Sequence, residues 1–233
     1  MNELLIICSV VFIFGATLIA YRFFGKTGLY FMTAIATIAS NIECLIIVNA
    51  FGMDQTLGNV FFAVTFLITD ILSENHSKKD ADKAVWTGIF TSVFFIIITQ
   101  SWMLYTPSDK DWVMPSINAV FSNTPRMMIS SLAVYAFSQF LDVRLYHLWW
   151  RITNKLCGDG KKFLWVRNNG STLISQLINT VLFTLCAFFG TYDTNTLISI
   201  MLSSYVIFIF TSLCDTPVIY LARKLKEKNK IPD

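Results

Sequence analysis

Seven long apolar blocks dominate the sequence and leave only short segments between them. They cover approximately residues 3–24, 28–51, 57–75, 84–105, 125–147, 171–191 and 196–221. A helix needs about 20 mostly apolar residues to cross a bilayer, and each block is close to that length. The blocks predict an all-α integral membrane protein, a bundle of about seven transmembrane helices in a single domain over residues 1–233. A six-span variant, with one short block as a re-entrant segment, is the alternative.

Composition and patterning exclude the other broad classes. Of the 233 residues, 55% are hydrophobic and 14% are charged, whereas charge in a soluble domain is nearer a quarter. The apolar blocks are continuous, unlike the alternating segments of about ten residues in outer-membrane barrels. Arg22 and Lys26 follow the first apolar run, where a signal peptide would have its small-residue cleavage site. We therefore expect the first block to be a retained span.

The basic residues are distributed very unevenly between the two sides of such a bundle. With seven spans, one side holds 16 of the 18 Lys and Arg residues, and the other holds only Lys110 and Arg126. The 16 are Arg22, Lys26, Lys78, Lys79, Lys83, Arg144, Arg151, Lys155, Lys161, Lys162, Arg167, Arg223, Lys224, Lys226, Lys228 and Lys230. Because basic loops stay in the cytoplasm, we expect the N-terminus outside and the C-terminus inside. We attribute the net charge of +3 to this orientation rather than to nucleic-acid binding.

Several kinds of active or metal site are not indicated. The two histidines do not form an HExxH motif, and the five cysteines show no paired spacing, so we expect neither a metal nor a disulfide framework. The segment FFGKTG at 23–28 ends like a phosphate-binding loop, but the first glycine of that motif would fall on Ala20. We see no set of nucleophile, base and orienting residue. We therefore expect no enzyme activity and no cofactor.

Polar residues inside the blocks are the candidates for a site, because a charge at mid-membrane costs about 2.5–3.5 kcal/mol. Such residues face the bundle interior. The candidate substrate-binding residues are Asn41, Glu43, Asp70, Glu74, Gln139, Asp142, Gln176, Asn179 and Asp215, and the candidate structural or gating residue is Arg126. Asp70 and Glu74 are four apart, and SQFLD at 138–142 matches SQLIN at 175–179. Residues three or four apart share a helix face, so several spans each present a polar stripe.

Each candidate also has a simpler explanation. Hydroxyl and amide side chains often hold membrane helices together without contacting a ligand. Asp70, Glu74 and Asp142 lie near predicted helix ends and could be solvated there. Glu43 lies about two-thirds along the second block, with no basic residue near it in sequence, which favours a functional and even proton-coupled role. We expect Arg126 to support the outer entrance, because Pro125 suits the first turn of a helix.

Five longer motifs carry a resemblance to a known family. The segments TDILSE, TPRMMISSLAVYAFSQFLDV, LYHLWWR, FLWVRNNGSTLISQLINT and CDTPVIYLARK occur in this order between about residues 58 and 224. They resemble the queuosine-precursor transporters, also called putative vitamin uptake transporters. Many relatives have an acid where this chain has Asn179.

The resemblance implies uptake of 7-deazaguanine bases such as preQ0, preQ1 and queuine for salvage in tRNA modification. It implies a multi-pass protein of the inner (plasma) membrane that acts as a secondary-type transporter. The alternative is a substrate-binding membrane subunit that docks on a separate ATP-driven module. The partners would be the deazapurine and the lipid bilayer. A homodimer is also open, because Ala36, Ala39 and Ser40 permit close helix contact, within one bundle or between two.

The resemblance and the stripes together predict a particular site. A carboxylate can accept hydrogen bonds from the two donors on the edge of a guanine-like base, and an amide can serve its oxygen. We expect Gln139, Asp142, Gln176 and Asn179 to meet, with Gln139 and Asn179 near mid-membrane. We expect Asp70 and Glu74 to lie at the inner exit, and Asp70 to matter more for substrate because it is deeper.

Overall fold

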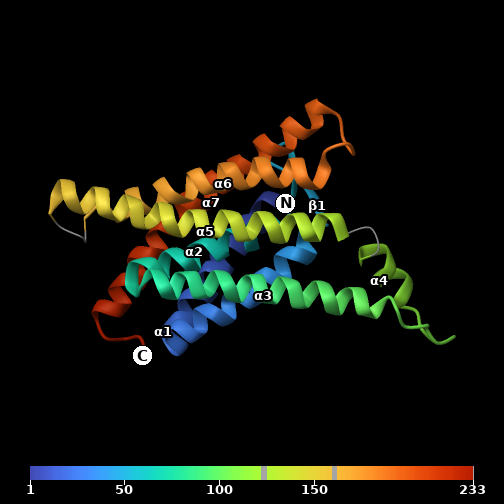
Figure 1. Cartoon of the computed structure of the whole chain (residues 1–233), viewed down its shortest axis with the longest axis horizontal. Helices are drawn as coiled ribbons and strands as arrows, with labels where there is room; N and C mark the ends of the chain where they lie inside the picture. The colour runs from blue at the N-terminus through green and yellow to red at the C-terminus, as the bar shows by residue number, and fades with distance from the viewer. Residues whose placement is uncertain (122–124, 159–161, 233) are drawn as a thin grey trace.

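The computed structural model describes residues 1–121, 125–158 and 162–232 (Figure 1). Within those ranges the chain forms seven helices and one two-stranded hairpin. The elements are α1 (Asn2–Glu43), β1 (Ile47–Ala50), β2 (Met53–Thr56), α2 (Gly58–Asn75), α3 (Lys78–Trp102), α4 (Met114–Phe121), α5 (Pro125–Cys157), α6 (Leu164–Phe188) and α7 (Thr194–Glu227). The long helices lie lengthwise beside one another, which confirms the all-α membrane bundle (Figure 1).

Helix α1 contains the first two predicted spans, folded back on each other. Gly25, near its middle, has the non-helical angles φ 56° and ψ −139°. The reversal brings the backbone of Gly28 against that of Ala20, where a Cβ atom would collide with the Ala20 carbonyl oxygen. The amide of Asn2 donates to the carbonyl oxygen of Asn49 at 2.8 Å, so the start of α1 lies beside the segment that follows its end.

The second predicted span ends earlier than expected. We predicted an apolar helix to residue 51, but α1 stops at Glu43, and residues 47–56 form the antiparallel hairpin β1–β2. Phe51 and Gly52, with φ of 55° and 73°, form its two-residue turn, and positive φ at both positions gives the tight turn that suits a hairpin. Glu43 is therefore the last residue of a helix, not a residue well inside one.

Helix α2 lies at the centre of the bundle. It packs against α1, α3, α5 and α7, and every residue from Ala63 to Ser73 is buried. By length and composition, α1, α3, α6 and α7 are long and apolar enough to cross a membrane. Because α2 is enclosed by protein, its polar side chains do not face lipid. The surroundings of α2 thus explain how a span can carry Asp70 and Glu74.

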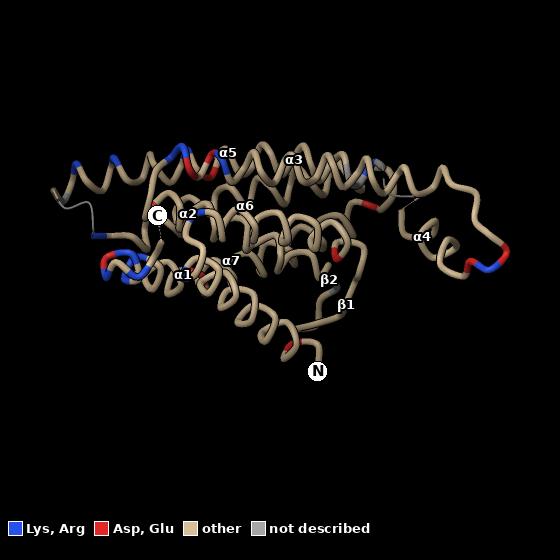
Figure 2. Tube along the Cα trace, turned by 90° about the horizontal axis from the view of Figure 1, so that it is seen from below, with Lys and Arg blue, Asp and Glu red and all other residues tan. Residues whose placement is uncertain are grey.

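The two ends of the bundle differ in charge (Figure 2). The basic end holds the reversal of α1, the α2–α3 and α5–α6 junctions and the C-terminus, and most Lys and Arg residues gather there. The hairpin end holds β1–β2, the α6–α7 turn and the short helix α4, which the sequence did not predict. Lys161, assigned above to the basic side, lies outside the described residues. The charge segregation that we used to predict orientation is therefore present in the fold.

Candidate functional site

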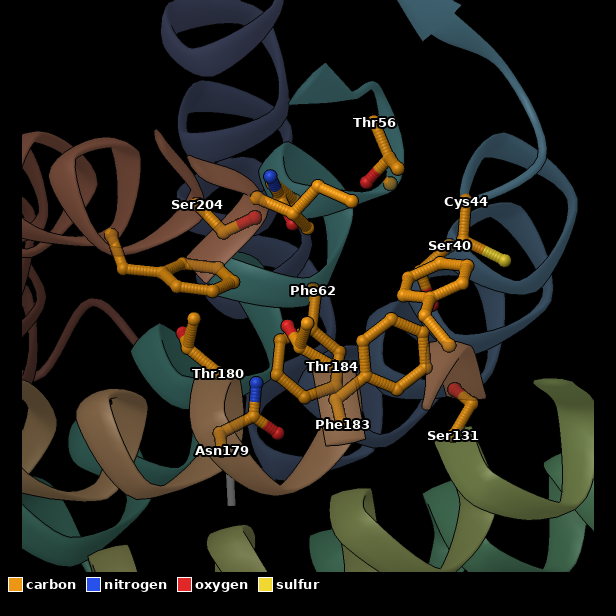
Figure 3. Close-up of a pocket in the computed structure, with 15 residues that line it drawn as sticks. Ser40, Cys44, Thr56, Phe62, Ser131, Asn179, Thr180, Phe183, Thr184 and Ser204 are labelled. Carbon is orange, nitrogen blue, oxygen red and sulfur yellow. The ribbon is translucent and has the colours of Figure 1, made fainter. Parts of the chain in front are cut away.

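A cavity lies at the hairpin end, among α1, α2, α5, α6 and α7 (Figure 3). It encloses about 600 Å³ of empty space, part of it continuous with the outside. Its aromatic walls are Phe62, Phe183, Phe188 and Phe208. Its polar lining is uncharged and consists of Ser40, Thr56, Asn59, Ser131, Asn179, Thr180, Thr184 and Ser204, with Cys44 beside them. Figure 3 shows the amide group of Asn179 pointing into this space. Such a lining suits a flat, polar, uncharged ring system.

Local sequence explains why there is room for a cavity here. Gly58 begins α2 and packs directly against the backbones of Ser40 and Cys44, so the end of α1 stays close to the start of α2. Six of the lining positions are Ser or Thr, whose small side chains leave volume unfilled. The phenyl ring of Phe62 packs edge-on against Tyr135, which fixes one wall.

Three buried carboxylates lie deeper, between the cavity and the basic end. Asp70 on α2, Asp142 on α5 and Asp215 on α7 are 0%, 0% and 2% exposed. Each accepts a hydrogen bond from α6: Thr172 Oγ1 donates to Asp70 at 3.1 Å, Ser175 Oγ to Asp142 at 2.8 Å, and Asn168 Nδ2 to Asp215 at 2.6 Å. We call these three carboxylates, with Gln176, the polar layer. The RNNGSTLISQ segment of α6 supplies its donors.

The polar layer has acceptor oxygens without donors. Within the described part of the chain, Asp70 Oδ1, Asp142 Oδ2 and Gln176 Oε1 are buried and have no hydrogen-bond partner. No described Lys or Arg forms an ion pair with the three carboxylates. A buried acceptor left unpaired costs about 1–3 kcal/mol, more if it is charged. The layer can therefore accept protons or the N–H groups of a ligand.

A buried ion-pair network closes the basic end. Both oxygens of Glu74 accept from Nη2 of Arg167 at 2.9 Å, and Oε1 also accepts from Arg223 Nη1 at 3.2 Å. The hydroxyl of Tyr146 donates to Oε2 at 2.6 Å. The Glu74 and Arg167 side chains are 2% and 0% exposed. We call these four residues the Glu74 lock, because they tie α2, α5, α6 and α7 together.

His76, which lies beside the lock, links α1 to α7 through hydrogen bonds. Its Nδ1 lies 2.8 Å from Lys226 Nζ, and its Nε2 lies 2.9 Å from the hydroxyl of Tyr21. Because the lysine can only donate, Nδ1 of His76 accepts and Nε2 carries the proton. Burial and the charges of Lys226 and Lys26 lower the pKa of His76 to about 4. His76 is therefore neutral at physiological pH and serves as a hydrogen-bonded link.

The predicted site residues fall in different places. Asn179 lines the cavity, and Asp70, Asp142, Gln176 and Asp215 form or join the polar layer. The α5 and α6 stripes do meet, through Ser175 and Asp142. The alternative that Glu74 is a solvated helix end is wrong, because its side chain is buried in the lock.

The remaining predicted residues lie apart from this axis. Asn41 donates to the Thr37 carbonyl within α1. Gln139 donates to Thr65 at 2.6 Å, so it links α5 to α2 instead of joining Asn179. Glu43 lines a separate hollow beside the first turns of α1. Of the three, Gln139 fits the simpler reading of a residue that holds two helices together, and a functional role for Glu43 stays a prediction.

Arg126 contacts the end of α6. Its Nε donates to the carbonyl oxygen of Cys186 at 3.0 Å, and its Nη2 to that of Phe189 at 2.7 Å. The last carbonyls of a helix have no partners within it, and a cation there also suits the helix dipole. This geometry matches the structural support that we expect of Arg126.

Sequence reasoning missed the lock partners and most of the cavity. Arg167 and Arg223 were read only as orientation charges, and Tyr146 was not singled out. A signal for Arg167 was present, since the polar residues Ser171 and Ser175 follow it at helical spacing on one face. The cavity hydroxyls gave no signal, because isolated Ser and Thr residues occur throughout membrane helices.

Comparisons with known proteins show the family to which the chain belongs. The family described as "Putative vitamin uptake transporter" matches residues 56–222. The "Probable queuosine precursor transporter" of Bacillus subtilis (strain 168) is 36% identical over 212 residues, covering 91% of this chain and 90% of that protein. No solved structure matches the chain. The matched region contains the polar layer, the lock except Arg223, and all of the cavity lining except Ser40 and Cys44.

Proposed function

We infer that the cargo of this protein is a queuosine precursor. The chain belongs to the Putative vitamin uptake transporter family and is therefore a multi-pass membrane transporter. The name of the Bacillus subtilis relative suggests this class, and the chemistry of the cavity supports it. The precursors that we propose are 7-deazaguanine bases: preQ0, preQ1 and queuine. They serve the salvage of a modified tRNA base.

The observation that carries this proposal is the cavity with aromatic walls and an uncharged polar lining. The cavity is concave and carries aromatic and polar side chains together, as small-molecule sites do. Phenyl rings such as Phe62 and Phe183 can stack on a purine-like base, a contact worth about 1–3 kcal/mol per base elsewhere. Asn179 and Thr180 offer donors and acceptors for the ring edge. Among the described residues no charged side chain lines the space, which suits the neutral deazaguanine ring that the precursors share.

The polar layer supplies the next contacts along the same axis. Gln176 lies less than one helical turn from Asn179, toward the basic end, and Asp70 lies about 12 Å of helix rise beyond Phe62. The guanine-like edge has two donors, N1–H and the exocyclic amine, and a carboxylate can accept from both. The unpaired oxygens of Asp70 and Asp142 match this need. We propose that they receive the base as it moves inward.

The closed basic end supports a transport cycle in which the two ends open alternately. The cavity is at one end and the Glu74 lock is at the other, so a base that enters the cavity cannot pass until the lock opens. We propose that the hairpin end faces outside and that the cycle needs no ATP. Protons held by Asp70 or Asp142 could couple uptake to the membrane gradient. A homodimer remains a prediction, although Ala36 is fully buried within one chain.

Proteoliposomes that contain only this chain test the proposal. We expect labelled preQ1 to exchange into vesicles preloaded with unlabelled preQ1, without ATP, and unlabelled preQ0 or queuine to compete. Adenine should not compete, because its edge lacks the two adjacent donors. Specific binding without any exchange would contradict a self-sufficient transporter and favour the subunit of an ATP-driven complex. Absence of binding to all three bases would contradict the substrate class.

A further inference from the structure

A second hollow lies at the basic end, outside the proposed transport axis. It is a groove between the α2–α3 junction and the outer face of α5, with about 1240 Å³ of empty space that includes open solvent. Ser73 and His76 come from the end of α2, and Ser77 and Lys78 from the start of α3. The α5 side carries Arg144, Leu145, His147, Leu148, Trp150 and Arg151. None of these residues lines the cavity at the hairpin end.

The groove carries a local excess of positive charge. Lys78, Arg144 and Arg151 are exposed, and none forms an ion pair with a carboxylate in the part of the chain that the structure describes. Two of the nearby carboxylates already pair with cations that do not line the groove. Glu74 is held in the lock, and Asp80 pairs with Lys26 and hydrogen-bonds Ser77.

Asp82 on α3 is the remaining acid near the groove, and its negative charge interacts with the imidazole of His147. It does not line the groove. Lys78, Arg144 and Arg151 are three cations against this single acid, so the groove favours an anion.

Two buried polar atoms in the groove lack partners. Ser73 is 3% exposed, and neither its Oγ nor Nε2 of His147 has a hydrogen-bond partner among the described residues. Both residues line the groove, and a hydroxyl or a neutral imidazole can donate to an anionic oxygen. These atoms lie just beneath the surface of the groove, so each can gain a partner if its side chain turns toward a bound phosphate group.

The surroundings of the groove are suited to an amphiphile. Towards the middle of the membrane, Trp86 on α3 packs edge-on against Phe140 on α5, at 5.5 Å between ring centroids. Trp86 and the next aromatic on that helix, Phe90, are 61% and 70% exposed. Phe140 lies one turn before Arg144 on the same helix. An apolar surface therefore begins where the basic groove ends.

We propose that this groove binds the phosphate headgroup of an anionic phospholipid, with its acyl chains along the exposed aromatic face of α3. Basic pockets between transmembrane helices at the cytoplasmic surface bind such headgroups in other proteins. The groove lies at the ends of α2 and α3, where the spans leave the membrane. Trp150 stacks on His147 at an interplanar angle of 7° and also lies 4.5 Å from the Arg167 guanidinium. A lipid bound here would thus contact a residue that supports the Glu74 lock.

Native mass spectrometry of the purified full chain tests the proposal, with phosphatidylglycerol and phosphatidylcholine of identical acyl chains. We expect about tenfold tighter retention of phosphatidylglycerol, because several cations face one anionic headgroup. The double substitution Arg144→Gln with Arg151→Gln should remove about tenfold of that affinity. Ser73→Ala, which removes only the buried hydroxyl, should remove about threefold.

A matched control uses Lys224→Gln with Lys228→Gln, which removes two exposed cations at the C-terminal end of α7 and just beyond it, at the same end of the bundle. This control should retain wild-type lipid binding. Equal losses in both double variants would overturn the proposal and show attraction to net charge alone. Displacement of the lipid by inorganic phosphate at equal concentration would overturn the choice of a phospholipid over free phosphate. Equal retention of the two lipids would also overturn it.

Discussion

The hairpin end and the basic end of the bundle are built from the same four helices in opposite ways. At the hairpin end, α2, α5, α6 and α7 present small hydroxyl groups and phenyl rings, which line a hollow of about 600 Å³ that includes open solvent. At the basic end, the same helices are joined by the Glu74 lock, whose central pair is almost completely buried. Between them lies the polar layer, whose carboxylates have hydrogen-bond donors from α6 but no ion pair with a Lys or Arg among the described residues.

The contrast shows how one set of helices can leave a cavity between them at one end and be joined by buried ion pairs at the other. At the hairpin end the described contacts are ring packing, such as Phe62 on Tyr135, and hydrogen bonds, such as those of Arg126. Opening the lock at the basic end separates buried charges. This is costly unless water or a ligand takes the place of the lost partner of each charge. We infer that movement of α6, which contributes to the cavity, the polar layer and the lock, links the two ends. Four substitutions test this contrast.

Glu74→Gln should have the largest effect. It leaves the buried Arg167 without a countercharge, and breaking a buried pair in this way costs about 3–5 kcal/mol. We expect a large fall in thermal stability in detergent together with loss of precursor exchange.

The double variant Glu74→Gln with Arg167→Met serves as the control. It removes both charges of the pair and should recover most of the stability, since an apolar pair can replace a buried ion pair. A single Glu74→Gln variant with unchanged unfolding temperature would show that the basic end is not held by this pair.

Asp70→Asn should affect the substrate more than the fold. It turns one acceptor oxygen into a donor, which would face the donor edge of the base. We expect affinity for preQ1 to fall about 30- to 100-fold, as for the loss of a hydrogen bond to a charged group. Titration of preQ1 binding, with the unfolding temperature as a folding check, measures this. Binding equal to wild type would remove Asp70 from the substrate path.

Phe183→Leu sharpens the proposed role of the cavity. Loss of the ring removes one stacking surface, so affinity for all three precursors should fall about tenfold. Phe90→Leu, at a 70% exposed position on α3, is the matched control and should leave affinity unchanged. If the two variants bind preQ1 equally well, the base does not lie in this cavity.

Arg126→Lys should have the smallest effect. A lysine cannot reproduce the two separate hydrogen bonds to the Cys186 and Phe189 carbonyls, because it lacks the planar guanidinium fork. We expect a loss of about 1 kcal/mol in stability and no change in precursor affinity. A selective loss of affinity would instead place Arg126 in the substrate path.

The sequence predicted the bundle well because the length and apolar character of the blocks directly indicate helices that cross a membrane. It placed the second span poorly, since residues 44–51 are apolar enough for lipid although positive φ at Phe51 and Gly52 forms a hairpin turn. The polar stripes identified Asp70, Asp142 and Gln176 as buried inside the bundle, because polar side chains that face lipid cost much more free energy. That prediction needed only helical spacing along single spans.

Pairing between helices could not be predicted in the same way. Glu74 and Arg167 are 93 residues apart, and nothing in one sequence indicates that they meet. The basic end contains so many Lys and Arg residues that a buried arginine is indistinguishable from an exposed one by count. The cavity depends on the volume that small side chains leave empty, which is a property of the packed bundle. Asn179 was found only because it belongs to a stripe.

Thiol labelling at Cys44 most directly tests whether the base occupies the cavity at the hairpin end. Cys44 lines this cavity, whereas Cys8 is exposed on α1 away from it. In variants that keep one of these cysteines as the only thiol, we predict that saturating preQ1 slows maleimide labelling of Cys44 and leaves Cys8 unaffected. Adenine should protect neither. Unchanged labelling of Cys44 under conditions where preQ1 binds the same variant would contradict the proposed site.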